Sequence, residues 1–543
     1  MNRAPSELAE PQSDASLAAR RRQAIVEVAL IFMVFFIHAA WPVPEVNETH
    51  YLTKAKHYWD PTWCPHDLFL DSADAHQVFY WTFGWLTRFL SLPATAWVGR
   101  VTTWGLLAWA WQRLSFTLVP RFLWSVLSAA LFVTLTSRMH MAGEWVIGGF
   151  EAKDVAYVFV FLALAALARE RWPAVWLLLG VASAFHALIG GWSVLAAGVA
   201  WLSAGRDRPA ILRMAPWLAL GLLLALPGLI AVLSLNWNVD PAVVREASRI
   251  YVFSRLPHHL VPQAFTLVFV FRHILVVGIW LLLCRFVPAG RGERLLRWFV
   301  AASIAMSLTG CLIAWLGVGR EAEVAVLLRY YWFRMADSLI PLGVSLETIR
   351  GLALLRRQRP AWAAWGLAVT MLIAALHVGA VAIDRQQNLR PPADKGIANL
   401  AAWREICQWA AENTAPDAMF ITPRNTQSFH WYAGRSEVAG YKDIPQDARA
   451  IVQWWQRIGD IYRQRSPDPD AEGFASVVEL GRAKLEALGR KYHADYVIAG
   501  PVPRLALDRI SPPNPSFVVY RLPQASETSP AHEVPAAEPQ PSR

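Results

Sequence analysis

Runs of about twenty apolar residues, bounded by arginine, proline or short polar loops, recur through the first 383 residues of the sequence. A hydrocarbon core of roughly 30 Å is crossed by a helix of about this length. The chain is 55% apolar and 17% charged, which fits a protein with many membrane spans better than a soluble enzyme. Twelve candidate spans lie near 24–42, 77–92, 95–112, 121–137, 155–168, 173–190, 191–204, 214–234, 264–286, 298–317, 325–347 and 361–383.

The arginine clusters predict which loops face the cytoplasm, because Lys and Arg are enriched on that side. Three arginines at 20–22 precede the first run, which lacks a clear cleavage site and is followed by further spans. It is therefore predicted to be a retained anchor with a cytoplasmic N-terminus. Clusters at 285–297 and 350–359 are also predicted inside, and the chain beyond 383 outside, which requires an odd number of crossings.

Residues 77–92 are the best candidate to lie flat in the interface, because this segment is short and carries an arginine. Eleven spans then remain, and residues 138–153 fall outside. A rival solution keeps 77–92 as a span, merges 173–204 into one, and moves 138–153 inside and Arg169 and Arg171 outside. The positive-inside rule favours the first solution.

The net charge of +10 does not indicate a nucleic-acid partner, because the basic residues lie in short clusters between apolar runs. The four cysteines are scattered, without a CxxC pair or the spacing of a disulfide framework. The predicted fold class is mainly α: a polytopic membrane helix bundle of about 11 to 13 spans with a small C-terminal extracytoplasmic α/β domain.

The pattern changes at residue 394 to alternating helices and short strands. ADKGIANLAAWREICQWAAENT predicts an amphipathic helix, AMFIT, SEVAG, DYVIAG and SFVVYRL predict strands, and two more helices are predicted near 446–465 and 472–490. The expected domains are a cytoplasmic tail at 1–23, a multi-span domain at 24–383 with an acidic first external loop at 43–76, an extracytoplasmic α/β domain at 384–523, and a disordered tail at 524–543.

Ionisable side chains in or beside spans cost roughly 2.5 to 3.5 kcal/mol each at a helix centre, so those retained usually pair or line a cavity. The first external loop offers Glu48 and Asp67. Such a carboxylate can remove a proton from a hydroxyl, or ligate a divalent cation that bridges phosphate oxygens. A solvated loop whose acids cap short helices is the alternative. The histidines and Cys64 of this loop match no strong zinc pattern, so no protein metal site is predicted.

Two later segments offer further binding groups. GEWVIGGFEAKD places Glu151 and Lys153 beside glycines that allow backbone to approach a ligand, although a turn between spans gives the same letters. VFSRLPHHLVP holds Arg255, His258 and His259, a cationic cluster that suits a phosphate head group or, alternatively, anionic lipid.

LLRYYWFRMADSLIPL places Arg334 and Asp337 at i and i+3, where they can neutralise each other. The alternative is that Arg334, with Arg329, faces a cavity that admits an anionic substrate. His186 between small residues is more typical of a helix-packing contact. TPRNTQSFHWYAGRSEVAGYKD is predicted to place charged residues on turns at strand ends, for binding an acceptor or for packing: Arg424, His430, Arg435, Lys442 and Asp443.

This layout resembles the membrane-embedded glycosyltransferases of the C-type superfamily, which use polyprenyl-phosphate sugars as donors. NETHYLTKAKHYWDPTWCPHDLF looks like that superfamily's acidic signature, and DYVIAG and SFVVYRL look like its closing strands. By this resemblance Glu48 would be the acceptor-activating base or a metal ligand, and Asp67 a second carboxylate. The superfamily's usual Asp-Glu or Asp-x-Asp appears here as Asn47-Glu48, which departs from the pattern.

More closely, most of the chain resembles an uncharacterised bacterial multi-span membrane protein family with a domain of unknown function. Four blocks carry that likeness: GEWVIGGFEAK, LPHHL, RYYWFRMAD and TPRNTQSFHWYAGRSEVAGYKDIP. The expected location is the bacterial cytoplasmic (inner) membrane.

The expected function is hexosyltransferase-like transfer of a sugar from a polyprenyl-phosphate donor to an envelope acceptor at the outer face of that membrane. Glu48 or Asp67 would deprotonate the acceptor. The expected partners are the lipid bilayer and the polyprenyl-phosphate-linked sugar, with no nucleic acid; no cofactor is specified, a divalent cation could take part, and the oligomeric state stays open. A transporter or flippase and a non-catalytic membrane scaffold are the alternatives. The predicted substrate-binding residues are Glu151, Lys153, Arg255, His258, His259 and Arg334.

Overall fold

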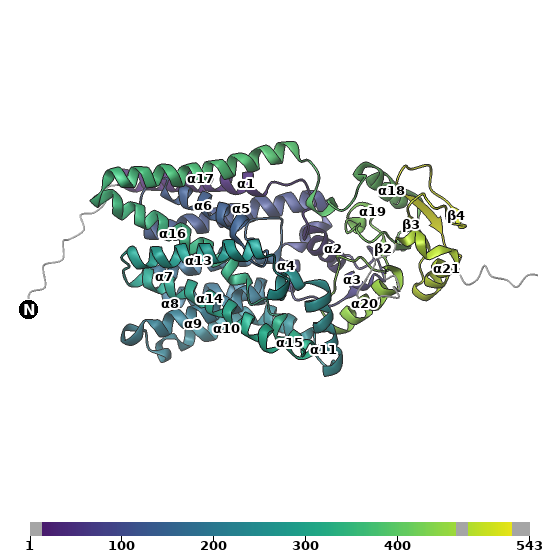
Figure 1. The fold of residues 1–543 in the computed structure, drawn as a ribbon, viewed down its shortest axis with the longest axis horizontal. Coiled ribbons are helices and arrows are strands. Elements are labelled where there is room, and N and C mark those ends of the chain that lie inside the picture. The colour runs from purple at the N-terminus through teal and green to yellow at the C-terminus, as the bar shows by residue number, and fades with distance from the viewer. Residues whose placement is uncertain (1–13, 463–475, 524–543) are drawn as a thin grey trace, which may run out of the picture. The chain divides into compact units, whose positions relative to one another are not determined.

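The computed structural model describes residues 14–462 and 476–523, which fold mainly into helices with one small sheet (Figure 1). The predicted disordered tail at 524–543 and most of the predicted cytoplasmic tail lie outside the described residues. The chain forms two compact units. Of the described residues, the membrane unit comprises 14–59, 72–393 and 445–452, and the C-terminal unit comprises 60–71, 394–444, 453–462 and 476–523.

Long helices dominate the membrane unit. In the described part of the chain they are α1 (Asp14–Ala39), α5 (Leu92–Leu118), α6 (Trp124–Met139), α7 (Ala152–Ala168), α8 (Trp172–Phe185), α9 (Ala187–Ser203), α10 (Ile211–Ser234), α13 (Leu267–Phe286), α14 (Arg291–Leu316), α16 (Arg334–Gln358) and α17 (Pro360–Gln387). Six of them, α1, α10, α13, α14, α16 and α17, are long and apolar enough to cross a membrane, and α8 and α9 are shorter apolar helices. These helices support a multi-pass membrane protein.

Shorter elements connect the long helices. They are α2 (Glu48–Trp59), α4 (Gln77–Thr82), η1 (Gly84–Arg88), α11 (Pro241–Arg249), η3 (Ile250–Arg255), α12 (Pro257–Leu260), η4 (Pro262–Ala264), α15 (Glu321–Leu328) and the single turns η2 (Gly205–Asp207) and η5 (Pro392–Asp394). The segment at 77–92 therefore contains two short helices and no continuous span. The predicted span at 325–347 is broken where the chain turns through Tyr331, whose φ of 55° no helix accommodates.

Contacts between loops bear on the two predicted topologies. Arg291 Nε lies 2.8 Å from Glu170 Oε2, and Arg291 also donates to the Asp207 carbonyl at 2.5 Å. A Cβ at Gly292 would lie 2.0 Å from the Ala168 carbonyl oxygen. The loops after α7 and α9 and the start of α14 thus share one end of the bundle. The rival solution needs the first and last of these on opposite sides, whereas the eleven-crossing solution places both inside; the number of crossings stays a prediction.

Cysteine labelling would test this topology. In a variant lacking the natural cysteines, Arg169→Cys is expected to stay unlabelled by a membrane-impermeant maleimide in intact cells, because its loop shares the end of Arg291. Arg357→Cys is the inside control and Arg504→Cys the outside control, since both topologies place them on those sides. Labelling of Arg169→Cys to the level of Arg504→Cys would instead support the rival solution.

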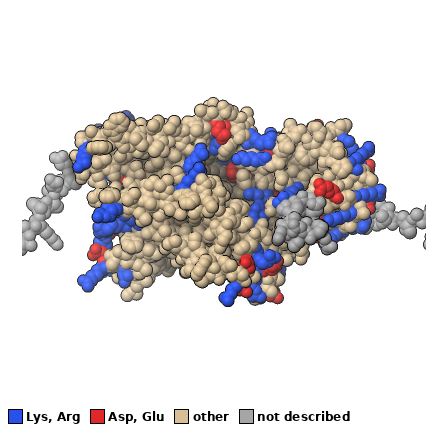
Figure 2. Space-filling model, in the orientation of Figure 1, with Lys and Arg blue, Asp and Glu red and all other residues tan. Residues whose placement is uncertain are grey.

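Close packing between α8 and α10 depends on glycine. A Cβ at Gly180 would lie 2.2 Å from the Gly221 carbonyl oxygen, and one at Gly221 would lie 2.6 Å from the Trp176 carbonyl oxygen. Small residues let helices approach in this way inside membranes. Outward faces carry exposed apolar side chains such as Leu282 on α13 and Leu376 on α17. Figure 2 accordingly shows a mostly tan surface over the long helices.

The C-terminal unit is a small α/β domain. Its sheet has the order β2-β1-β3-β5-β4, formed by β1 (Met419–Ile421), β2 (Ser436–Glu437), β3 (Tyr496–Ala499), β4 (Asp508–Arg509) and β5 (Val518–Arg521). β1 pairs in parallel with β2 and β3, whereas β5 is antiparallel to β3 and β4. The helical elements are α3 (Leu68–Asp71), α18 (Leu400–Asn413), α19 (Phe429–Ala433), η6 (Val477–Leu480), α21 (Gly481–Tyr492) and the part of α20 (Ala448–Tyr462) from residue 453 onward.

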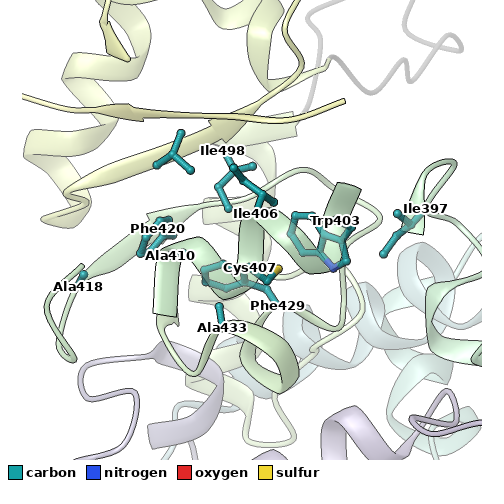
Figure 3. Close-up of a cluster of buried hydrophobic side chains, with 11 residues drawn as sticks. Ile397, Trp403, Ile406, Cys407, Ala410, Ala418, Phe420, Phe429, Ala433 and Ile498 are labelled. Atoms are coloured by element: carbon teal, nitrogen blue, oxygen red, sulfur yellow. The ribbon is translucent and has the colours of Figure 1, made fainter. Parts of the chain in front are cut away.

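The core of this unit lies between α18, α19 and the sheet (Figure 3). Trp403 from α18, Phe420 from β1 and Phe429 from α19 are fully buried there. The predicted first helix starts later than the amphipathic pattern suggested, because Asn399 caps α18 by accepting the Ala402 amide proton at 3.1 Å.

Candidate functional site

A buried charge cluster lies at one end of the membrane unit, where α1 ends and α5, α7 and α16 begin. Charges withdrawn from water are costly, so side chains of this kind are retained when they pair or when function needs them. The cluster consists of Glu45, Glu48, Arg100, Glu144, Glu151, Lys153, Asp154 and Arg334. Five carboxyl groups thus stand against three cationic groups.

Glu48 is fully engaged in this cluster. Its carboxylate accepts two hydrogen bonds from Arg100, from Nε at 2.6 Å and from Nη2 at 2.7 Å, which form a bidentate ion pair. Both side chains are about 1% exposed or less. The amides of Phe150 and Glu45 donate to the same carboxylate at 2.9 and 2.8 Å. Four donors occupy its oxygens, so Glu48 holds the first loop and α5 together. Its predicted role as the acceptor-activating base stays a prediction.

Glu151, Lys153 and Glu144 continue the cluster. Lys153 Nζ lies 3.6 Å from Glu151 Oε1 and 3.3 Å from Glu144 Oε1, and 3.7 Å from the centre of the Trp145 ring. Asn47 donates to Glu151 Oε2 at 3.1 Å, which ties the first loop to the start of α7. The residues that the sequence singled out in the first loop and in GEWVIGGFEAKD are thereby brought together.

Arg334 is the cation with donors to spare. Its Nε lies 2.7 Å from Glu144 Oε2, and its guanidinium lies 3.9 Å from the Tyr331 ring centre. With 15% of its side chain exposed, Arg334 is more accessible than Lys153 or Glu144. Among the described residues, no acceptor is bonded to either terminal nitrogen of Arg334. Arg334 is the first residue of helix α16, and the positive N-terminal end of the helix dipole also favours an anion.

Asp337 does not neutralise Arg334, so the predicted i, i+3 pair is wrong. Its carboxylate accepts the amides of Met141, Ala142 and Glu144 at 2.6, 2.8 and 3.2 Å. Asp337 therefore fixes the loop before α7, and Arg334 pairs with Glu144 instead.

Two further carboxyl groups belong to the cluster: Glu45, which the sequence did not single out, and Asp154, the last residue of GEWVIGGFEAKD. Burial, reinforced by the Glu151 carboxylate, raises the pKa of Glu45 to about 7. A carboxyl group that titrates near neutral pH can accept and return a proton. Both Asp154 oxygens are buried without a hydrogen-bond partner. A charged residue inside an apolar run was the available signal for Asp154 and also for Arg100.

The segment at 255–259 meets the same loop through one histidine. His259 Nδ1 lies 2.5 Å from the Ala142 carbonyl oxygen, and a Cβ at Gly143 would lie 3.1 Å from the His259 ring. Arg255 is buried, and His258 is exposed, with its ring centre 4.1 Å from that of His259 and the two rings tilted by 45°. The structure thus brings His259 to the loop that carries Glu144, and leaves His258 facing outward.

A second polar group lies near the first helix of the loop. His76 Nδ1 lies 2.9 Å from Asp74 Oδ1, and Lys54 Nζ lies 3.6 Å from Asp74 Oδ2. Burial would raise the pKa of Asp74, but Lys54 and His76 hold it well below its usual range. His186 ends α8 with an extended backbone and caps α9 by accepting the Ile189 amide proton at 3.3 Å, close to the His76 ring.

Asp67 belongs to the C-terminal unit. Its Oδ2 lies 2.7 Å from His430 Nε2 and accepts the Glu437 amide at 2.9 Å, and its Oδ1 accepts the amides of Phe69 and Leu70. These contacts assign Asp67 to the internal organisation of that unit. Its predicted role as a second catalytic carboxylate stays a prediction.

Comparison with protein families gives a match to a domain of unknown function (DUF6798) over residues 401–461, less than half of the chain. This confirms the predicted resemblance to proteins that carry such a domain. No curated protein matches the sequence significantly.

Among solved structures, the chain is similar to ArnT from Cupriavidus metallidurans bound to undecaprenyl phosphate, with 14% identity and a TM-score of 0.47 over 96% of this chain and 100% of that chain. It is also similar to the oligosaccharyltransferase AglB from Archaeoglobus fulgidus in complex with an inhibitory peptide and a dolichol-phosphate. That match has 12% identity and a TM-score of 0.44, over 90% of this chain and 70% of that chain.

Proposed function

We propose that this protein is a membrane glycosyltransferase that moves a sugar from a polyprenyl-phosphate donor to an acceptor hydroxyl at the outer face of the cytoplasmic membrane. The observation that carries the proposal is the buried charge cluster. In it, the terminal nitrogens of Arg334 have no acceptor among the described residues, and burial raises the pKa of Glu45 to about 7. In this reaction the protein must bind the donor phosphate and remove a proton from the acceptor hydroxyl.

Arg334 is the residue proposed to hold the donor phosphate. Its terminal nitrogens have no acceptor among the described residues, and its Nε is already oriented by Glu144. A planar guanidinium can bind two phosphate oxygens at once. Lys153, beside Glu144, adds positive charge to the same part of the cluster. His259, in α12, contacts the Ala142 carbonyl of the loop that Asp337 anchors, and so borders the cluster.

Glu45 is the group proposed to take the acceptor proton. As the acceptor oxygen forms its bond to the sugar carbon, the bond from that carbon to the phosphate oxygen breaks, and the polyprenyl phosphate leaves with the electron pair. The acceptor proton passes to the Glu45 carboxylate. Glu48 and Arg100 hold the loop that carries Glu45, through the Glu45 amide.

Lipid retention tests the proposed phosphate site. Native mass spectrometry of the purified protein is expected to show a polyprenyl-phosphate lipid, and Arg334→Gln is expected to reduce its occupancy about 10-fold to 100-fold, the loss equivalent to one charge-assisted hydrogen-bonded contact. Arg320→Gln, an exposed arginine before α15, is the matched control and should retain the lipid. Equal lipid retention in both variants would remove Arg334 from the phosphate site.

A further inference from the structure

We propose that His430, Glu437 and Asp443 form a binding site for a divalent transition-metal cation, such as Zn²⁺, within the C-terminal unit. The inference is independent of the proposed transferase activity, because all three residues lie outside the membrane unit. Their side chains are almost completely buried, with 2%, 3% and 1% exposure. One nitrogen and two carboxylate oxygens from them lie within 4.8 Å of one another.

The fold positions these ligands at the carboxyl ends of two parallel strands. Glu437 ends β2, and His430 lies in α19, which connects β1 to β2. Asp443 lies in the loop after β2. Side chains at the carboxyl ends of parallel strands commonly converge on a ligand.

His430 is oriented by a carboxylate on the side away from the other two ligands. Its Nε2 lies 2.7 Å from Asp67 Oδ2, so this nitrogen donates a hydrogen bond to Asp67. The other ring nitrogen, Nδ1, faces Glu437 Oε1 at 3.7 Å. A carboxylate that holds one ring nitrogen while the other faces a metal is a recurring arrangement in metal sites. Asp67 is itself fixed by three backbone amides, from Phe69, Leu70 and Glu437.

One carboxylate oxygen of Glu437 gives independent support for a cation at this position. Glu437 Oε2 accepts a hydrogen bond from the Thr422 hydroxyl at 2.6 Å, but Glu437 Oε1 is buried and accepts no hydrogen bond from the described residues. Buried polar atoms nearly always have a partner, and a bare carboxylate oxygen is among the costliest to leave without one. The distance of 3.7 Å to His430 Nδ1 is too long for a hydrogen bond.

The same distance suits two ligands of one ion. Zn²⁺ binds histidine nitrogen and carboxylate oxygen at roughly 2.0 to 2.2 Å in a tetrahedron, which sets neighbouring ligand atoms about 3.3 to 3.6 Å apart. An imidazole in the set favours a transition metal over Mg²⁺ or Ca²⁺, which prefer oxygen ligands alone. Three protein ligands would leave one position for water.

Gly440 makes room for the two carboxylates. A Cβ at this position would lie 2.4 Å from Glu437 Oε1 and 2.8 Å from Asp443 Oδ2. Both distances are shorter than any real contact of a Cβ, so a larger residue would force the two acids apart. The Gly440 carbonyl is held in place by Trp454 Nε1 at 2.9 Å.

The side chains around the pocket also favour a cation. Three carboxyl groups, from Asp67, Glu437 and Asp443, are buried around one imidazole, and a divalent ion would offset their negative charge.

The test uses the full-length protein in detergent, stripped with a chelator and titrated with Zn²⁺. We expect one Zn²⁺ per chain by elemental analysis and a higher unfolding temperature of the C-terminal unit when zinc is present. Glu437→Gln and Asp443→Asn keep the side-chain shapes and are expected to weaken zinc binding at least 10-fold. His493→Asn, at a helix end in the same unit, is the matched control and should bind zinc as the wild type does.

X-ray absorption at the zinc edge identifies the atoms bound to zinc in the wild-type protein, so this part of the test does not depend on whether a variant folds. Wild-type protein should show nitrogen and oxygen neighbours only. Sulfur in the coordination shell would assign the metal to the buried Cys64 or Cys407 instead. Sulfur ligands, absence of stoichiometric zinc in the wild type, or unchanged affinity in a folded Glu437→Gln variant would each overturn the proposal.

Discussion

Arg100→Leu is expected to yield little or no folded protein. Arg100 is fully buried, forms the bidentate pair with Glu48, and donates through Nη1 to the Trp41 carbonyl at 2.5 Å. Removing one partner of a buried ion pair leaves the other charge uncompensated and costs about 3 to 5 kcal/mol. That loss is comparable with the whole stability of many proteins, about 5 to 15 kcal/mol. Size-exclusion profiles and unfolding temperatures in detergent would measure the effect.

Arg113→Leu is the matched control for this prediction. Arg113 lies on the same helix, α5, but its side chain is exposed, so its replacement should leave the elution profile unchanged. The double variant Arg100→Leu, Glu48→Gln should recover part of the loss, because it removes the buried charge and the glutamine oxygen can still accept one of the two amides, Glu45 or Phe150, which bond to different carboxylate oxygens. A well-folded Arg100→Leu single variant would show that the pair does not hold this end of the bundle together.

Glu45→Gln is expected to lower sugar transfer about 100-fold to 10,000-fold while the protein stays folded. The glutamine keeps the shape of the side chain but cannot accept the acceptor proton. Because burial and the Glu151 carboxylate raise the pKa of Glu45 to about 7, Glu45 is largely protonated below that pH. Wild-type activity should therefore rise as the pH increases through about 7. The residual activity of Glu45→Gln should lack this step.

Transfer from a radiolabelled polyprenyl-phosphate sugar, measured from pH 5 to 9, would give both readouts. Glu323→Gln is the control, because Glu323 is an exposed acid in α15. Wild-type transfer by Glu45→Gln would assign the base to another carboxyl group, with Asp154 the next to be replaced. If the activity of Glu45→Gln still rises through pH 7, the group that titrates there is not Glu45.

The elements of the fold were largely predictable, because local patterns determine them. Apolar runs predicted most of the long helices, and AMFIT and DYVIAG predicted β1 and β3. The break before Arg334 was missed, since it depends on the left-handed turn at Tyr331 rather than on hydropathy. Arg100 was missed for a similar reason, because a single charge hardly alters the mean hydropathy of a long apolar run.

The pairing of charges was less predictable. Arg334 and Asp337 are correctly spaced for a pair, but Asp337 binds three loop amides that are close only in the folded chain. Glu48 and Asp67 share one loop in the sequence and separate into different compact units. The sequence alone determined where helices and strands form, because periodicity and hydropathy act over neighbouring residues. Tertiary structure decided which acid meets which base, because a buried charge takes the partner that lies nearest in space, often more than fifty residues away in the chain.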